Sequence, residues 1–198
     1  MIITDSLTER FGAFIIIVLG ETLTGVVAGL SSQPISALTL AVGLIAVVVG
    51  SGAWWTHFDF AGGRRPRTDR PASVQWILGH LPLTAAIAAM GAAMVSLIDH
   101  AHDGGAPAAT GWVLCGGAAV VLYATMLVAG TLQVWDRDRG LYRPLAWICA
   151  VVAVACLGVS AARPASLVLV LALVLLLSIP WSYAVVRRLA RPADPPAP

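Results

Sequence analysis

The sequence predicts an all-α protein, a polytopic bundle of about six transmembrane helices with both termini in the cytoplasm. Hydrophobic residues make up 59% of the 198 residues, and charged residues make up only 11%, which is about half the usual share in a soluble domain. Several apolar runs also reach the roughly 18 residues that mark a membrane span. Composition and run length together exclude a soluble enzyme.

Six spans follow from the apolar runs and from the glycine, proline and polar residues that interrupt them. They cover about residues 11–30, 35–58, 76–98, 111–134, 145–162 and 165–186. We treat residues 1–190 as one transmembrane domain. Residues 191–198, RPADPPAP, are expected to be a disordered tail, because proline-rich segments of this kind do not build a packed core. No cleavable signal peptide is expected, so the first run stays as a helix.

The arginines predict the orientation of these spans. All twelve basic residues are arginine, and eleven of them fall on one side of the predicted membrane, against Arg163 alone on the other. Positive loops stay on the cytoplasmic side, which places both termini there. The formal net charge of +2 is too small to indicate nucleic acid as a partner, so the expected partner is the lipid bilayer.

Glu21 lies near the middle of the first span. An ionised carboxylate at that depth costs roughly 2.5 to 3.5 kcal/mol on insertion scales, so it should face other helices or a wet cavity, or be protonated. At 100° per residue, Gly25 and Gly29 share nearly the same face in a GxxxG pattern, and Arg10 returns to within about 20° of it. Glu21 is therefore either a structural residue bonded to a neighbouring helix or a functional carboxylate.

A second group of polar residues is predicted at the cytoplasmic ends of the second and third spans. His57 and Asp59 close the second span, and His80 lies one turn inside the third, next to Pro82. The two spans are joined by a short arginine loop, so these side chains should lie at similar depth. They form either a His/Asp cluster at the mouth of a path through the bundle, or interfacial anchors and helix caps.

The remaining polar residues do not indicate an enzyme. The loop DHAHD (99–103) contains metal-capable side chains, but their spacing fixes no ligand geometry, so we expect no metal or cofactor. No nucleophile elbow, HExxH motif, phosphate-binding loop or dinucleotide fingerprint is present. The three cysteines are expected to be apolar packing residues inside spans: Cys115, Cys149 and Cys156.

Three segments resemble the bacterial low temperature requirement A family, in the order and spacing of that family. They are LTERFGAFIIIVLGET (7–22), WWTHFDF (54–60) and GHLPLTAAIAAMGA (79–92). The resemblance implies a multi-pass protein of the bacterial inner membrane, from a family that is named for a requirement in growth at low temperature and has no settled biochemical activity. The positions that it carries over are Glu9, Arg10, Gly20, Glu21, Trp54, Trp55 and His80.

The chain also departs from the family pattern. It lacks the acidic, aromatic segment that begins family chains, so it resembles their C-terminal half. A histidine that the family often has before the ERFG glutamate is Ser6 here, and the aromatic of the WWxYF-type segment is His57. The expected protein partner is accordingly either a missing N-terminal half or a second copy of the chain.

Two functions from different classes remain. The first is a proton- or cation-linked transporter or permeation protein whose path contains Glu21, His57, Asp59 and His80. The second is a non-catalytic membrane scaffold or cold- and stress-adaptation factor. In the scaffold, the residues for helix pairing are Glu9, Arg10, Gly25 and Gly29.

Overall fold

The computed structural model describes residues 3–103 and 105–190, and helices are the regular elements of this part of the chain. In order, they are α1 (Asp5–Ser32), α2 (Ala37–Phe60), α3 (Arg70–Asp99), α4 (Ala108–Ala129), α5 (Gln133–Arg137), α6 (Arg139–Ala161) and α7 (Ser166–Leu189). All except α5 are long and apolar enough to cross a membrane. The prediction of an all-α bundle with about six transmembrane helices is confirmed. The predicted tail, residues 191–198, lies outside the described residues.

The helices begin earlier than the predicted spans where a polar residue caps them. α1 begins at Asp5, before the predicted residue 11, and the Thr4 hydroxyl accepts a hydrogen bond from the Leu7 N–H at 3.3 Å. Asp69 caps α3 in the same way through the Ala72 N–H at 3.2 Å. Hydropathy marks only the apolar part of a helix, whereas capped polar turns extend it into the membrane interface.

The predicted end of the fourth span is wrong. α4 ends at Ala129, and residues 133–134, expected inside the span, belong to the short helix α5. The chain turns at Thr131, whose hydroxyl donates to the Val128 carbonyl at 2.6 Å. The Thr131 carbonyl accepts the Arg67 N–H at 2.8 Å, so this turn is fastened to the loop between α2 and α3.

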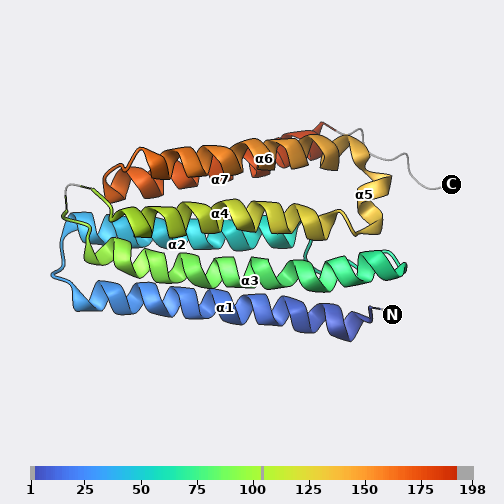
Figure 1. Cartoon of the computed structure of the whole chain (residues 1–198), viewed down its shortest axis with the longest axis horizontal. Helices are drawn as coiled ribbons and strands as arrows, with labels where there is room; N and C mark the ends of the chain where they lie inside the picture. Colours follow the sequence, from blue (N-terminus) through green and yellow to red (C-terminus); the bar gives the residue numbers. More distant parts are fainter. Residues whose placement is uncertain (1–2, 104, 191–198) are drawn as a thin grey trace.

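The six long helices run alternately up and down the bundle (Figure 1). α3 and α4 are its most buried members: 56% and 61% of their most apolar stretches are buried, against 22% for α1. α1 packs on α3 and α2, while α6 packs on α4 and α7 packs on α2 and α6. One face of α1 is therefore packed on the bundle, and its opposite face has no neighbour in the described chain.

Glycines set the closest contacts between helices. A Cβ atom added to Gly91 of α3 would lie 2.8 Å from the Thr22 hydroxyl oxygen of α1. One added to Gly117 of α4 would lie 2.5 Å from Met90 Cγ of α3. Both distances are shorter than van der Waals contact, so a larger residue would push the helices apart. Close approach through small residues is typical of membrane bundles, where lipid provides no hydrophobic drive for helices to pair.

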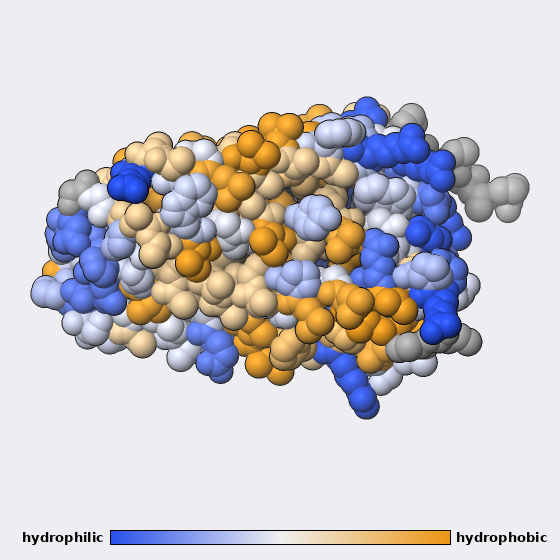
Figure 2. All heavy atoms as spheres, in the orientation of Figure 1, coloured by the Kyte–Doolittle hydropathy of each residue, from blue (hydrophilic) through white to orange (hydrophobic). Residues whose placement is uncertain are grey.

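Hydrophilic residues gather at the two ends of the bundle, with a hydrophobic belt between them (Figure 2). The start of α1, the α2–α3 loop, α5 and the end of α7 lie at one end, which we call the arginine-rich end (Figure 1). There Arg65 pairs with Asp5, and Arg67 lies 3.4 Å from Asp136. Hydrogen bonds from Arg139 hold the pKa of Asp136 below its usual range. That this end faces the cytoplasm stays a prediction.

Candidate functional site

Two histidines from neighbouring helices meet inside the bundle near the arginine-rich end. His57 of α2 and His80 of α3 have ring centroids 5.6 Å apart, with their planes at 79°. Their exposed fractions are 1% and 4%, so both rings are removed from solvent and from lipid. The structure thus brings together two of the four residues that the sequence assigns to a path.

Aromatic rings surround this histidine pair. The ring centroid of His80 lies 4.4 Å from that of Trp76 and 4.8 Å from that of Phe11. His57 lies edge-on to Phe58, at a centroid distance of 5.5 Å. These rings come from α1, α2 and α3, so three helices enclose the pair. The enclosure separates the imidazoles from water while offering aromatic faces that attract a cation.

The two imidazoles differ in their hydrogen bonds. His80 Nδ1 donates to the carbonyl of Trp76, one helical turn back, at 2.7 Å. Nδ1 therefore carries the hydrogen, and Nε2 of the neutral ring is a proton acceptor. His57 Nδ1 is buried and has no hydrogen-bond partner among the described residues. An unpaired buried polar atom costs about 1 to 3 kcal/mol and is unusual in folded proteins.

Asp59 does not join the histidines, although the sequence interpretation expected the three side chains to lie close together. Its Oδ1 accepts a hydrogen bond from Arg188 of α7 at 2.7 Å, and its backbone carbonyl accepts one from Arg64 at 2.7 Å. The reason is helical geometry, because two residues along a helix turn a side chain by about 200°. His57 consequently faces α3, whereas Asp59 faces α7.

Glu21 lies at the surface of the chain, so the expectation that it faces a neighbouring helix is wrong for the described residues. Gly25 and Gly29 do pack against α3. Cβ atoms added to these glycines would lie 3.2 Å and 3.5 Å from methyl carbons of Val95. The buried position beside Glu21 belongs to Thr22, which meets Gly91 of α3. Glu21 is offset from Gly25 by about 40°, and that offset places it beyond the edge of the packed face.

Glu9 and Arg10, the other two residues expected in helix pairing, are exposed, and their side chains make no ion pair or hydrogen bond in residues 3–103 and 105–190. The start of α1 is instead held by Asp5, which pairs with Arg65 of the α2–α3 loop. Within the chain, the glycines pair α1 with α3, and the charged residues of the ERFG segment do not.

The predicted outer loop is fastened to the ends of two helices. His102 Nε2 lies 3.0 Å from Ser36 Oγ and 3.1 Å from Thr39 Oγ1, at the start of α2. His100 Nδ1 donates to the Ser96 carbonyl of α3 at 2.7 Å. Among the described residues, no group of three histidine, cysteine, aspartate or glutamate side chains is placed to hold a metal ion.

Sequence reasoning missed three residues that shape this region. Phe11 forms one wall of the histidine pair, although it directly follows Arg10 in the ERFG segment. Arg188 holds Asp59 from a helix far away in the sequence, and no local pattern indicates that pairing. Trp76 could have been found, because it precedes His80 by four residues and so lies on the same helix face.

The chain was compared with known proteins. The model of the bacterial low temperature requirement A protein family matches residues 3–179. No curated protein and no solved structure matches. The match covers most of the chain, including the helices that carry His57, His80 and Glu21. With its six apolar helices, this chain is a multi-pass membrane protein that belongs to the bacterial low temperature requirement A family.

Proposed function

We propose that the chain is a proton- or cation-linked transporter or permeation protein of the bacterial inner membrane, and not an enzyme. Its working group is the His57–His80 pair, which takes up and releases a proton. The supporting observation is the burial of two imidazole rings 5.6 Å apart, one of which has an unpaired ring nitrogen. Histidine is the side chain whose unperturbed charge change lies closest to neutral pH.

The surroundings of the pair suit a single mobile proton. Two imidazolium rings at this separation would repel each other, so the pair would hold at most one positive charge at a time. Trp76 and Phe11, with centroids 4.4 Å and 4.8 Å from that of His80, can stabilise that charge through their ring faces. Nε2 of His80 and Nδ1 of His57 are the ring nitrogens that could accept the proton.

Asp59 and Glu21 enter this proposal in different ways. Asp59 Oδ2 is buried without a hydrogen-bond partner in the described chain, at the arginine-rich end of the helix that carries His57. This oxygen is free to accept a hydrogen bond near the mouth of the proposed path. Glu21 lies about ten residues further along α1 than Phe11, which is about 15 Å along the axis, and on the outer face. It therefore does not exchange a proton directly with the histidines of the same chain.

The scaffold hypothesis has its own supporting observation, the outer face of α1. Gly20, Thr24 and Ala28 form an exposed row of small residues beside Glu21, and a Cβ added to Gly20 would meet nothing within 4 Å. Rows of small residues allow close helix pairing in membranes. In this function a second copy of the chain, or a helix of another protein, would cover this face.

A flux assay tests the proposal. The full chain is reconstituted in liposomes that contain a pH-sensitive dye, and a pH gradient or a cation gradient is imposed. We expect His57→Gln and His80→Gln to lower the rate at least about tenfold, because the amide does not carry a proton at neutral pH. His102→Gln is the matched control, since His102 lies in the loop at the opposite end of the bundle.

The outcomes separate the two functions. No flux above protein-free liposomes for the wild-type chain under either gradient would overturn the transport proposal and favour the scaffold. Wild-type flux with unchanged rates in both histidine variants would remove the pair from the path. Loss of flux in His102→Gln as well would show that the effect is not specific to the buried pair.

A further inference from the structure

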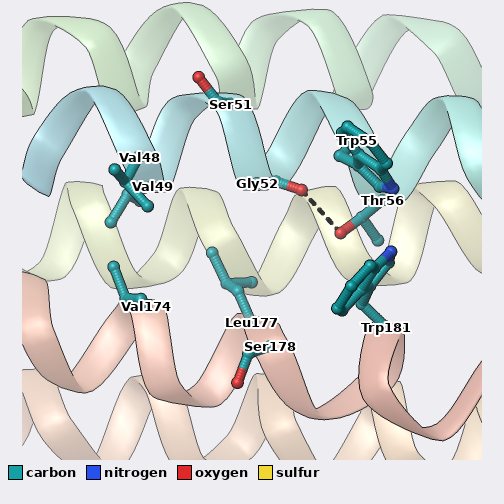
Figure 3. Close-up of a pocket in the computed structure, with 10 residues that line it drawn as sticks. All are labelled: Val48, Val49, Ser51, Gly52, Trp55, Thr56, Val174, Leu177, Ser178 and Trp181. Carbon is teal, nitrogen blue, oxygen red and sulfur yellow. Dashed lines mark hydrogen bonds between the residues drawn. The ribbon is translucent and has the colours of Figure 1, made fainter. Parts of the chain in front are cut away.

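A hollow lies between α2 and α7, on the side of the bundle away from α1 (Figures 1 and 3). Its volume is about 410 Å³, within the range of small-molecule sites. Valines and a leucine form much of its wall, and two serines, a threonine, a glycine and two tryptophans complete it. The lining residues that carry the argument are Val48, Ser51, Gly52, Trp55, Val174 and Trp181.

The hollow changes in character along the two helices. Apolar side chains, among them Val48 and Val174, line one part, and Trp55 and Trp181 lie at the other (Figure 3). The two indole rings pack edge to face with centroids 6.4 Å apart. Tryptophan prefers the boundary between hydrocarbon and headgroups. This part of the hollow therefore lies toward the membrane interface.

Positive charge follows directly beyond the tryptophans. Asp59 lies one helical turn after Trp55, and Arg188 lies two turns after Trp181, so both continue the same seam between α2 and α7. Arg188 pairs with the Asp59 carboxylate at 2.7 Å, and Arg64 donates to the Asp59 carbonyl at 2.7 Å. One guanidinium group is paired with the Asp59 carboxylate and a second is bound to the Asp59 backbone carbonyl, so these three side chains together carry a net positive charge at the end of the seam.

A glycine keeps the hollow open. A Cβ atom added to Gly52 would meet nothing within 4 Å, so no side chain packs over this part of α2. By contrast, side chains of the neighbouring helix occupy the space beside Gly91 and Gly117 elsewhere in the bundle. The space beside Gly52 is thus not consumed by contact between α2 and α7, although the two helices pack on each other.

We propose that the α2–α7 hollow binds an anionic phospholipid, with one acyl chain beside Gly52 and the phosphate at Arg188 and Arg64. Along the seam, the apolar wall is followed by the tryptophan pair and then by the arginines. This order matches that of a lipid in a bilayer, from the acyl chain through the interface region to the headgroup. Arginine also suits phosphate, because its fork of N–H donors binds two oxygens at once. The lipid site does not include the histidine pair, although Arg188 and Arg64 both contact Asp59, which lies near the mouth of the proposed path.

Lipid titration of the full chain in detergent, followed by native mass spectrometry, tests this site. The two probes are phosphatidylglycerol and phosphatidylcholine with identical acyl chains. We expect the first phosphatidylglycerol to bind about tenfold more tightly than phosphatidylcholine, since each arginine near a lipid phosphate adds attraction. Arg188→Gln should reduce this preference to less than about threefold.

Filling the hollow tests the acyl-chain part. Gly52→Leu should weaken binding of phosphatidylglycerol about tenfold, whereas Gly158→Leu should leave it unchanged, because Gly158 is an equally open helix glycine on α6. If Gly52→Leu does not fold, Ser51→Leu fills the same hollow from an exposed position.

Three results would overturn the proposal. The first is equal affinity for the two lipids, and the second is unchanged binding in the variant that fills the hollow. The third is a lipid-free dimer that Gly52→Leu dissociates, since it would show that a second copy of the chain occupies the groove.

Discussion

The His57–His80 pair and Glu21 are both titratable groups in apolar helices, but the bundle places them in opposite environments. The two imidazoles are 1% and 4% exposed and lie among aromatic rings. Glu21 lies on the outer face of α1, and its side chain makes no hydrogen bond or ion pair with the described residues. The helix face on which a polar residue falls, and not its polarity, decides whether the bundle encloses it.

This difference has an energetic consequence. The histidine pair is already separated from lipid by its own chain, so the fold can hold it in one geometry. Glu21 would meet hydrocarbon if the chain were alone in a bilayer, at a cost of roughly 2.5 to 3.5 kcal/mol. Protonation of the carboxyl group, or cover by another protein helix, removes most of that cost. The pair is therefore enclosed by this chain, whereas Glu21 is not.

Among the variants near the histidine pair, removal of the Trp76 ring should change the free energy of unfolding most. Trp76 is 2% exposed and packs between Phe11 and His80, at centroid distances of 4.9 Å and 4.4 Å. Trp76→Ala should lower the free energy of unfolding by about 3 to 5 kcal/mol, because it leaves a cavity beside the pair. Thermal unfolding in detergent, followed by circular dichroism, measures this loss.

Trp147→Ala is the matched control, because Trp147 is 75% exposed on α6. We expect it to change the free energy of unfolding by no more than about 1 kcal/mol. Equal losses in the two variants would show that the aromatic enclosure of the pair contributes no packing beyond that of a surface tryptophan.

The two faces of α1 can be compared through two glycines. Gly91 of α3 lies against the packed face of α1, and Gly20 lies on the outer face of α1 itself. Gly91→Val should lower the free energy of unfolding by about 1 to 3 kcal/mol, because a Cβ at that position meets the Thr22 hydroxyl oxygen at 2.8 Å. Gly20→Val, on the side of Glu21, should stay within about 0.5 kcal/mol in a single chain, because no atom lies within 4 Å of its added Cβ. The same unfolding measurement serves both variants.

A clear loss for Gly20→Val would instead show that the outer face of α1 is packed in solution. A loss that depends on protein concentration would identify the partner as a second copy of the chain. A loss that does not depend on concentration would contradict the placement of Gly20 on an open face.

The six spans could be predicted because the length of an apolar run is a local property of the sequence. The helix face that a residue occupies could not be predicted in the same way. Every face of a transmembrane helix is apolar, so hydropathy does not mark the buried side. Glu21 shows the consequence. Gly25 and Gly29 of the GxxxG pattern lie against α3, but an offset of about 40° leaves the carboxylate outside.

The sequence could predict at what depth in the membrane the residues of the candidate site lie, but it could not predict which side chains they contact. The loop that joins α2 and α3 already required His57 and His80 to lie at similar levels, and their rings are 5.6 Å apart. The pairing of Asp59 with Arg188 depends on how α7 packs against α2. More than a hundred residues separate these two helices in the sequence. Contacts of that range come from tertiary packing and leave no periodic signal in the sequence.

The role of the unpaired nitrogen can be tested by replacement of the ring with an apolar side chain. His57→Leu removes a buried polar atom that has no partner, so stability should be unchanged or higher by about 1 kcal/mol, while proton flux is lost. Thermal unfolding and liposome flux are measured on the same preparation. A loss of stability greater than about 2 kcal/mol would mean that the imidazole is held by a structural hydrogen bond and is not poised for proton exchange.

The smallest expected change in stability belongs to Glu21→Gln, which removes the charge but keeps the shape of an exposed side chain. Its free energy of unfolding in detergent should stay within about 0.5 kcal/mol of the wild type.

A growth test then measures function. The variant is expressed in a bacterial strain that lacks its own family member, growth is measured at low temperature, and a membrane-expression blot measures the amount of protein. Normal expression with lost growth would show that the ionisable carboxyl group is needed, either for a proton path that a partner completes or for charged pairing with that partner. Full growth with Glu21→Gln would contradict a working carboxylate. Glu21 would then be an outer-face residue whose hydrogen-bonding shape is sufficient, since an amide can still donate and accept at a helix interface.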